Sequence, residues 1–353
     1  MYKIIILLFM AASTIFFLNK FLLRNNVLIY NNKISKHKDN YKSKILLSGG
    51  LGVLFYLMIY HILFSFKQEF LNIIFFSLPF LFLGFLSDTN VIRRTNYRLY
   101  MMIIFCALPI YFLELNISII DINFLQYFLS NIYFSIFFVA LCLAIVVNGS
   151  NFIDGRHGNL SLFILTSLIS IIFLTEQKII YLSYSKDLCA IVAFLFIFTL
   201  FNFSEKSFFG DNGAYFLGSI IGLVAIDIFL KNKNLSSYYV ANLLIYPAYE
   251  VFVSVLRRSL SKKSTLQPDK HHLHNLIFIF LNANLGMKSR IINILTSILI
   301  FISNASFIFF SSSKPENKKY QLELLFTYIL MYSMTYLILK FVISKYKNNY
   351  KVI

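Results

Sequence analysis

Long runs of apolar residues, separated by short polar stretches, follow one another along almost the whole chain. A helix needs about 20 predominantly apolar residues to cross the hydrocarbon core of a bilayer. The pattern therefore predicts an all-α, polytopic integral membrane protein with about 10–11 transmembrane helices. The expected spans are residues 3–23, 46–65, 70–87, 98–114, 131–148, 159–175, 186–204, 213–230, 238–257, 291–311 and 321–344.

The loops between the spans are too short to fold as soluble domains, so residues 1–353 are expected to form a single membrane-embedded domain. The polar motifs fall at about residues 45–280, and the last two spans follow at about 291–344. The first apolar run is longer than the roughly 7–15 residues of a signal-peptide core. We therefore expect it to remain as an uncleaved first span.

Composition supports the membrane assignment. The chain is 58% hydrophobic and only 13% charged, whereas a soluble domain carries roughly 25% charged residues. Its three cysteines lie inside apolar runs without paired spacing. They are expected to pack as small apolar residues rather than to form disulfides or bind zinc.

The positive charges predict an orientation. The lysines and arginines outside the interior of the predicted spans form two sets in alternate loops, one of 21 and one of 9. Because cytoplasmic loops carry the excess of Lys and Arg, the larger set is placed in the cytoplasm, with the N-terminus outside and the C-terminus inside. The net charge of +17 is thus explained by topology, and no nucleic-acid partner is expected.

The polar stretch NGSNFIDGRHG, residues 148–158, interrupts two apolar runs. Asn148, Asn151 and Asp154 are spaced three apart, which places them near one face if the preceding helix continues. A polar face at a membrane mouth is costly unless a ligand, an ion or water occupies it. The stretch is therefore a candidate site, the alternative being a loop at the membrane surface.

Two other stretches carry candidate chemistry near the ends of spans. Asp88, in GFLSD, is followed by Arg93, Arg94 and Arg98. Asp88 could act as a metal ligand or a general base, with the arginines binding phosphate. Alternatively, it is an aspartate at a helix end, and the arginines only follow the positive-inside pattern. Asp211, in GDNG, precedes a span as either a helix cap or a ligand for a hard cation.

Two basic loops have open interpretations. In the first, lysines precede Gly49 and Gly50. Either the lysines bind phosphate groups while the glycines let the backbone approach a ligand, or the lysines anchor the topology while the glycines allow close helix packing. In the second, QPDKHHLHN crowds His271, His272 and His274 together. These histidines could bind zinc, but no cysteine or HExxH pattern accompanies them, and contact with a diphosphate fits equally well.

All of these clusters fall on the predicted cytoplasmic side. A conduction path would instead need polar residues through the middle of several spans. The one-sided arrangement therefore favours an enzyme with a cytoplasmic active site over a conduction path.

The order of the motifs resembles one family, the polyprenyl-phosphate N-acetylhexosamine-1-phosphate transferases, which include the phospho-N-acetylmuramoyl-pentapeptide transferases. GFLSD resembles the family's acidic pair and NGSNFIDGRHG its NxxNxxDGxDG pattern. GDNGAYFLG and PDKHHLHN resemble two further family patterns. The resemblance covers about residues 45–280, a stretch with these four motifs in order.

The resemblance implies an enzyme of the bacterial cytoplasmic (inner) membrane that moves a sugar 1-phosphate from a UDP-sugar to polyprenyl (undecaprenyl) phosphate and releases UMP. Mg²⁺ is the implied cofactor, with Mn²⁺ as an alternative. GlcNAc or a derivative is the first expectation for the sugar. The product would enter cell-wall, lipopolysaccharide or O-antigen synthesis, and a homo-oligomer is compatible with the sequence.

Residue roles carry over by motif position. The resemblance implies that Asp211 holds Mg²⁺, that Asp88 is the second metal carboxylate or a base, and that Asp154 is the third catalytic carboxylate. The implied substrate-binding residues are Asn148, Asn151, Asn202, Phe208, Arg258, His272 and His274.

Two positions depart from the family pattern. Ser87 stands where the first residue of the acidic pair is expected, and His157 stands where the second aspartate of DGxDG is expected. The first change questions a mechanism with two adjacent carboxylates, and the second questions the usual nucleotide contact. An inactive paralogue is therefore one alternative to the enzyme, and a non-enzymatic transporter of lipid-linked sugars is another.

Overall fold

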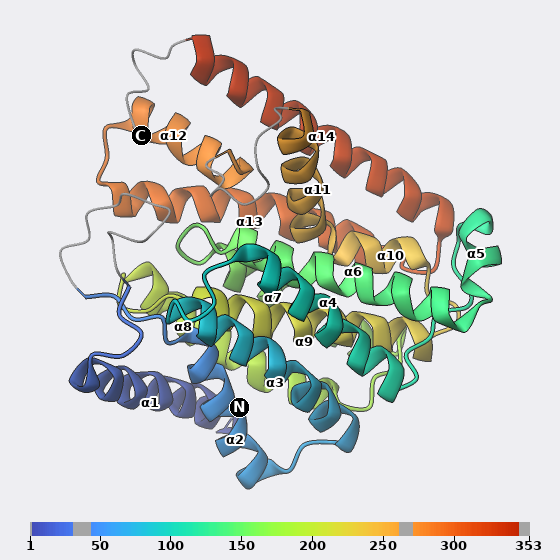
Figure 1. Cartoon of the computed structure of the whole chain (residues 1–353), viewed down its shortest axis with the longest axis horizontal. Coiled ribbons are helices and arrows are strands. Elements are labelled where there is room, and N and C mark those ends of the chain that lie inside the picture. Colours follow the sequence, from blue (N-terminus) through green and yellow to red (C-terminus); the bar gives the residue numbers. More distant parts are fainter. Residues whose placement is uncertain (1, 31–43, 261–270, 346–353) are drawn as a thin grey trace.

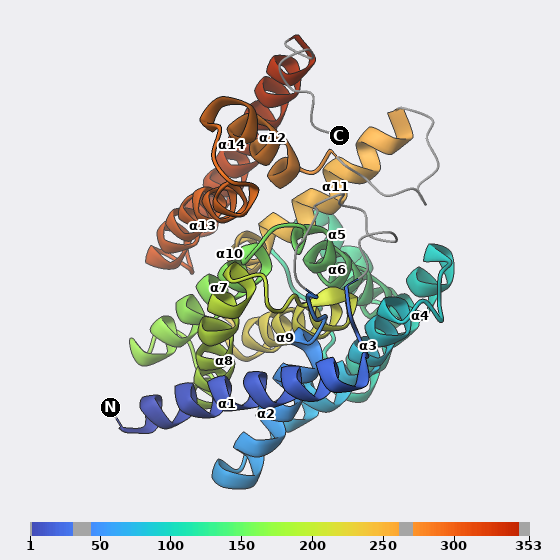
Figure 2. The same ribbon diagram turned by 90° about the vertical axis from the view of Figure 1, so that its left-hand side faces the viewer.

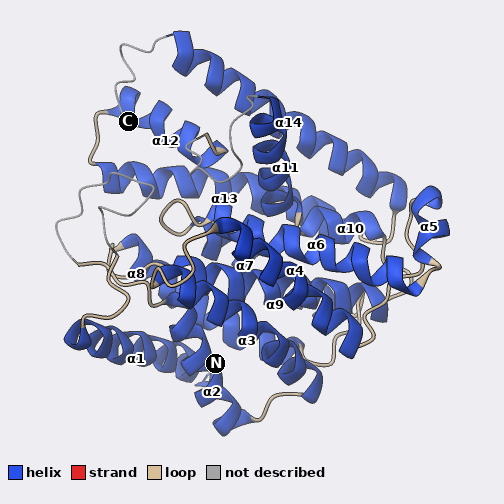
Figure 3. Cartoon of the chain, viewed as in Figure 1, coloured by secondary structure: helices blue, strands red, loops and turns tan. Residues whose placement is uncertain are grey.

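The computed structural model describes residues 2–30, 44–260 and 271–345 (Figure 1). These residues form the helices α1 (Tyr2–Asn25), α2 (Gly49–Phe64), α3 (Gln68–Asp88), α4 (Thr95–Phe112), α5 (Asn123–Leu129), α6 (Ile132–Ile153), α7 (Asn159–Glu176), α8 (Ser185–Phe203), α9 (Gly210–Lys231), α10 (Ser237–Leu243), α11 (Ile245–Leu260), α12 (Leu273–Leu285), α13 (Ser289–Ser313) and α14 (Lys318–Lys345). The described part of the chain contains no β-strand, only isolated bridges at Leu46 (Figure 3).

The expected all-α, polytopic fold is confirmed. Among the described residues, eight helices are long and apolar enough to cross a membrane, and a bent pair would make nine. The eight are α1, α3, α6, α7, α8, α9, α13 and α14. The predicted spans 46–65 and 98–114 are also helical, as α2 and α4, but α2 has only 16 residues and α4 is not among the eight.

One predicted span, 238–257, was wrong as a continuous helix. The chain forms α10 and α11 instead, which meet at an angle of 77°. Pro247 lies in the first turn of α11, where a missing N–H is tolerated, although a proline further inside a single long helix would break it. As a result α11 points away from the centre of the bundle (Figure 2).

Helix α9 lies at the centre of the fold, and 83% of the residues in its most apolar stretch are buried. It packs mainly against α3 and α6 (Figure 1). Small residues allow this close approach, as is common between membrane helices. A Cβ atom added at Gly84 would lie 2.3 Å from the Asn212 Cα and 2.4 Å from the Asp211 carbonyl oxygen. The C-terminal end of α3 and the N-terminal end of α9 therefore touch through their backbones.

The outer helices keep apolar side chains on the surface. Only 17% of the residues in the most apolar stretch of α14 are buried. Phe326, Leu330 and Phe341 on this helix are exposed. An exposed apolar surface of this kind is expected where lipid replaces water. Helices α12, α13 and α14 contact one another on one side of the molecule (Figure 1) and meet the remaining helices mainly through α7 and α10.

Candidate active site

Asp88 caps the central helix. Its Oδ1 accepts a hydrogen bond from the backbone N–H of Asp211 at 3.0 Å. Its Oδ2 accepts from the backbone N–H of Asn212 at 3.0 Å and from the Asn212 side chain at 2.6 Å. These contacts satisfy free N–H groups in the first turn of α9, where a negative charge is favourable. The carboxylate at the end of α3 thereby fixes the segment that carries Asp211.

Gly210 makes the start of α9 possible. Its φ of +69° lies in the left-handed region, which glycine adopts at little cost. A Cβ atom here would also lie 2.7 Å from Asp88 Oδ2. The motif GDNG therefore needs this glycine for both backbone conformation and the approach of Asp88.

Asp211 belongs to a compact polar triangle. Its Oδ2 accepts a hydrogen bond from the Ser87 hydroxyl at 2.5 Å and pairs with Arg98 Nη1 at 2.7 Å. The same Nη1 donates to the Ser87 oxygen at 2.5 Å. The Asp211 side chain remains 20% exposed, and its Oδ1 takes no part in these contacts. Asp211 is thus positioned on one side and accessible on the other.

Asp154 lies at the C-terminal end of α6, one turn after Asn151. Burial of the carboxyl group, together with the negative charges of Asp211 and Asp88, raises the pKa of Asp154 well above its ordinary value. Asn151 donates to the Tyr215 hydroxyl at 3.0 Å, which joins this end of α6 to α9. Three motif carboxylates therefore share one electrostatic environment, which a cation would stabilise.

The turn after Asp154 is held by its neighbours. A Cβ atom added at Gly155 would lie 2.3 Å from His274 Nε2, so this backbone lies directly against the histidine motif. Arg156 is buried and donates to Asn275 Oδ1 at 2.8 Å and to Asn293 Oδ1 at 2.7 Å. The Arg156 guanidinium also lies 3.8 Å from the centroid of the Phe278 ring. This arginine, counted above as a topological charge, connects the turn to α12 and α13.

Glu250 orients the histidines. This buried carboxylate accepts from the backbone N–H of Leu273 at 3.0 Å and lies 2.9 Å from His272 Nδ1. The His272 and His274 rings are nearly parallel, with centroids 5.4 Å apart. A hydrogen bond to one ring nitrogen fixes the orientation of an imidazole and thus the direction of the other nitrogen.

The predicted substrate-binding residues differ in their surroundings. Asn148 is half-buried one turn before Asn151, and Phe208 lies between the rings of Tyr30 and His157. Asn202 is buried, and both ends of its amide are used within the protein. Its Oδ1 accepts from the Gly158 N–H at 2.6 Å and its Nδ2 donates to the Ser207 carbonyl at 3.1 Å. Its observed contacts position the loops, so substrate binding by Asn202 stays a prediction.

Other predicted features lie at the edge of the described structure or outside it. Arg258 is half-buried near the end of α11. The lysines at positions 33–42 and the Pro268–Asp269–Lys270 part of the histidine motif lie outside the described residues.

Sequence reasoning assigned no role at this site to Arg156 or Tyr215, and it did not separate Arg98 from its neighbours Arg93 and Arg94. Tyr215 carried a usable signal, because it follows Asp211 by four residues and so lies on the same helix face. Arg98 had none that separated it from Arg93 and Arg94, since all three fit the positive-inside pattern.

The donor set fits a hard cation only in part. Within the described residues, no group of three His, Cys, Asp or Glu side chains could hold a metal ion alone. Zinc bound by the histidines therefore has no support in this part of the chain. Mg²⁺, in contrast, commonly uses one or two carboxylates together with phosphate oxygens of a substrate. The accessible side of Asp211, near Asp154, suits that second arrangement.

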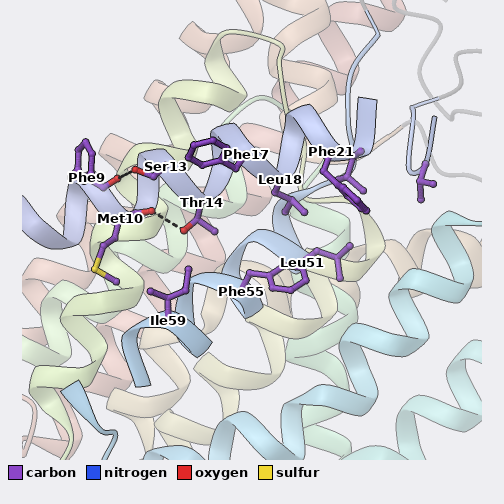
Figure 4. A pocket seen from close by; sticks show the side chains of 12 residues that line it. Phe9, Met10, Ser13, Thr14, Phe17, Leu18, Phe21, Leu51, Phe55 and Ile59 are labelled. Carbon is purple, nitrogen blue, oxygen red and sulfur yellow. Dashed lines mark hydrogen bonds between the residues drawn. The ribbon is translucent and has the colours of Figure 1, made fainter. Parts of the chain in front are cut away.

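An apolar groove of about 810 Å³ lies elsewhere, between α1 and α2 (Figure 4). Phe9, Phe17 and Phe55 are among its lining residues. The hydroxyl groups of Ser13 and Thr14 donate to carbonyls of their own helix, at 2.7 and 2.8 Å. The lining offers no charged group, so the groove has no part in the polar chemistry of the site.

Comparison with known protein families matches a segment that contains part of the site. Residues 70–229 match a family model described as "Glycosyl transferase family 4". This segment runs from α3 to α9 and contains Ser87, Asp88, the stretch 148–158 and Asp211. The matched region thus includes all three carboxylates that the fold brings together.

Individual relatives extend the similarity. The chain is 29% identical over 173 residues to a "Probable undecaprenyl-phosphate N-acetylglucosaminyl 1-phosphate transferase" of Bacillus subtilis, covering 48% of this chain and 46% of the relative. It is 28% identical over 268 residues to a phospho-N-acetylmuramoyl-pentapeptide-transferase of Borreliella burgdorferi, covering 67% and 75%. It is 25% identical over 202 residues to an undecaprenyl-phosphate alpha-N-acetylglucosaminyl 1-phosphate transferase of Thermotoga maritima, covering 57% and 59%. The alignment thus spans about half of the first relative and more of the other two.

Proposed function

We propose that this chain, whose residues 70–229 match the family model described as "Glycosyl transferase family 4", transfers a hexosamine 1-phosphate from a UDP-sugar to a polyprenyl phosphate and releases UMP. The observation that carries the proposal is the convergence of Asp88, Asp154 and Asp211 at adjoining helix ends. The names of the relatives describe this reaction class. The motif order described above supports the same assignment.

The proposed transfer exchanges one phosphorus–oxygen bond for another. An oxygen of the lipid phosphate forms a bond to the sugar-bearing phosphorus of the donor. The bond between that same phosphorus and the oxygen that bridges the two donor phosphorus atoms breaks, and the bridging oxygen leaves as part of UMP with the electron pair of the bond. Charge accumulates on the phosphoryl oxygens, so catalysis depends on positioning and electrostatic stabilisation. A bound Mg²⁺ or Mn²⁺ would supply charge neutralisation on the diphosphate.

The protein groups divide this work. Asp211, on its accessible side, and Asp154 would hold the cation. Asp88 holds the first turn of α9 through three hydrogen bonds, and so keeps Asp211 in place. That Asp88 also serves as a base or as a metal ligand stays a prediction.

The anionic diphosphate needs donors, and the histidine motif supports that role. His272 and His274 lie beside the Gly155 turn, where imidazole nitrogens can donate to phosphate oxygens. Phe208 and Asn151 lie near the same turn and are proposed to contact the nucleotide. The acceptor's apolar tail can stay within the bilayer, which explains why the catalyst is a membrane protein.

The finer assignments are proposals of the same kind. GlcNAc or a derivative is the proposed sugar, and the product is proposed to start synthesis of a cell-wall or surface polysaccharide. The loop charges support a site that faces the cytoplasm of a bacterial inner membrane.

The test supplies the purified chain with undecaprenyl phosphate, Mg²⁺ and a series of UDP-sugars, including UDP-GlcNAc and UDP-GalNAc. Formation of lipid-linked sugar together with UMP is expected. Absence of both products for every donor would refute the catalytic proposal. Binding of UDP without turnover would instead favour the inactive paralogue, and sugar-lipid movement without UMP release would favour a transporter.

Two variants test the site assignment. Asp211→Asn and Asp154→Asn should each lower kcat by at least about a hundredfold, the scale on which one electrostatic group acts in a transition state. Glu316→Gln, at an exposed carboxylate between α13 and α14, is the matched control and should keep full activity. Full activity in either aspartate variant would show that its carboxylate is not catalytic.

A further inference from the structure

Arg98 is placed where its charge does not serve its own helix. It lies in the first turn of α4, which begins at Thr95. The N-terminal end of a helix carries a partial positive charge, so a cation there is unfavourable for the helix. The guanidinium instead extends to Asp211 and Ser87, at 2.7 and 2.5 Å. A reason for this arginine must therefore be sought in the site.

Its donors are not all used. Nη1 serves Asp211 and Ser87, and Nη2 makes a long contact of 3.4 Å to the Thr95 hydroxyl. Nε is buried and has no hydrogen-bond partner among the described residues. A buried donor without an acceptor is costly, and a phosphate oxygen would satisfy it. The other two arginines of the cluster, Arg93 and Arg94, are exposed and contact Asn90 and Tyr97.

Ser87 helps to hold the Arg98 guanidinium against Asp211. A serine hydroxyl can accept a hydrogen bond from the guanidinium and at the same time donate to the carboxylate. It adds no negative charge of its own, whereas an aspartate at this position would compete with Asp211 for the arginine. With Ser87 present, the charge of Arg98 is delivered to Asp211 alone.

We propose that Arg98 neutralises Asp211 in place of a divalent cation in the free protein, and binds the donor diphosphate once a cation has taken its place on Asp211. This inference rests on the proposed function. Arg98 and the cation neutralise the same Asp211 carboxylate and repel each other, so the arginine opposes cation binding. Arg98 and the diphosphate attract each other, so the same arginine favours nucleotide binding.

The two effects have opposite signs, and this distinguishes them from a structural role. In Arg98→Gln, Mn²⁺ without nucleotide should bind about tenfold tighter, because one competing positive charge is gone. UDP in the presence of saturating Mg²⁺ should bind about tenfold more weakly, because a charge-assisted hydrogen bond is lost. Free Mn²⁺ can be followed by electron paramagnetic resonance, and UDP binding by calorimetry on the full chain in detergent.

Two further variants complete the experiment. Arg94→Gln removes an exposed arginine of the same loop and should change neither affinity. Ser87→Ala removes one hydrogen-bond partner of Arg98 with little change in volume. It should tighten Mn²⁺ binding and weaken UDP binding, each by a smaller factor than Arg98→Gln. It also supplies the answer if Arg98→Gln lowers the melting temperature too far for binding to be measured.

The outcomes separate the two levels of inference. If the wild-type chain binds neither Mn²⁺ nor UDP, the proposed function falls and this inference with it. If it binds both, and loss of Arg98 leaves Mn²⁺ affinity unchanged or weaker, or leaves UDP affinity unchanged, the exchange of partners is wrong while the proposed function stands.

Discussion

His157 has lost the acid–base behaviour of an ordinary histidine. Its side chain is only 4% exposed and lies against the ring of Phe208, with Nδ1 4.0 Å from a Glu205 oxygen. Burial, reinforced by the charges of Arg156 and Arg290, lowers the pKa of His157 to about 3. A neutral imidazole can donate as well as accept, whereas the aspartate of the family pattern can only accept. The change at this position therefore alters hydrogen bonding beside Phe208.

The shifted pKa predicts a pH effect on stability. An unfolded histidine takes up a proton near pH 6.5, whereas folded His157 stays neutral down to about pH 3. Folding therefore becomes less favourable as the pH falls from 6.5 toward 3, by about 2 kcal/mol at pH 5. Thermal unfolding at pH 7.5 and pH 5 should show a smaller loss for His157→Gln than for the wild type. Equal losses in both proteins would mean that His157 is protonated in the folded state.

At the scale of the element, the start of α9 depends on a residue from another helix. Asp88 provides the cap that serine, threonine or aspartate usually provides from within the same chain segment. Asn212 adds a second tie, since its side chain also donates to the carbonyl of Leu47 at 3.2 Å. Helices α3 and α9 and the segment before α2 therefore meet at one point.

Removal of the cap should have a local signature. In Asp88→Ala, the amide protons of Asp211 and Asn212 should exchange faster with solvent, and the protein should lose about 1 kcal/mol of stability, as is usual for a missing cap. Hydrogen exchange followed by mass spectrometry measures the first effect. If activity disappears while exchange at these amides is unchanged, Asp88 acts as a base or metal ligand rather than as a cap.

Most of the helices, and the proximity of the three motif carboxylates, were predictable from the sequence. Apolar runs locate helices because lipid requires about 20 apolar residues per crossing, and ordered motifs placed Asp88, Asp154 and Asp211 together. The bend between α10 and α11 was missed although Pro247, inside the predicted span, is a signal for a break. The angle of the bend was hidden, because an apolar run does not encode the direction in which the next helix continues. The inward positions of Arg98 and Arg156 were also hidden, since a charge count cannot distinguish an exposed arginine from a buried one.

At the scale of the whole molecule, Arg156 joins two groups of helices. It reaches from the turn after α6 to Asn275 on α12 and Asn293 on α13. Helices α12 and α13 form one group with α14. The position of His272 and His274 relative to Asp154 therefore depends on this buried guanidinium.

Loss of this link should affect both stability and the site. Arg156→Ala should cost about 3 kcal/mol, because it removes a buried cation and leaves two amide oxygens without their donor. Asn293→Ala, which removes one acceptor only, should cost less. Denaturation midpoints in a fixed detergent, combined with UDP affinity, provide the measurement. An Arg156→Ala protein with unchanged stability and affinity would show that α12 and α13 are held without it.

The contact between Gly84 and the first residues of α9 has one more consequence. A spacing set by two main chains leaves no room even for a methyl group, so it does not depend on which apolar side chains surround it. The lipid-facing surfaces can therefore exchange one oily residue for another without changing the separation of the carboxylates. Many of the 41 phenylalanines in this chain can therefore be replaced by other apolar residues while the distances within the candidate active site stay the same.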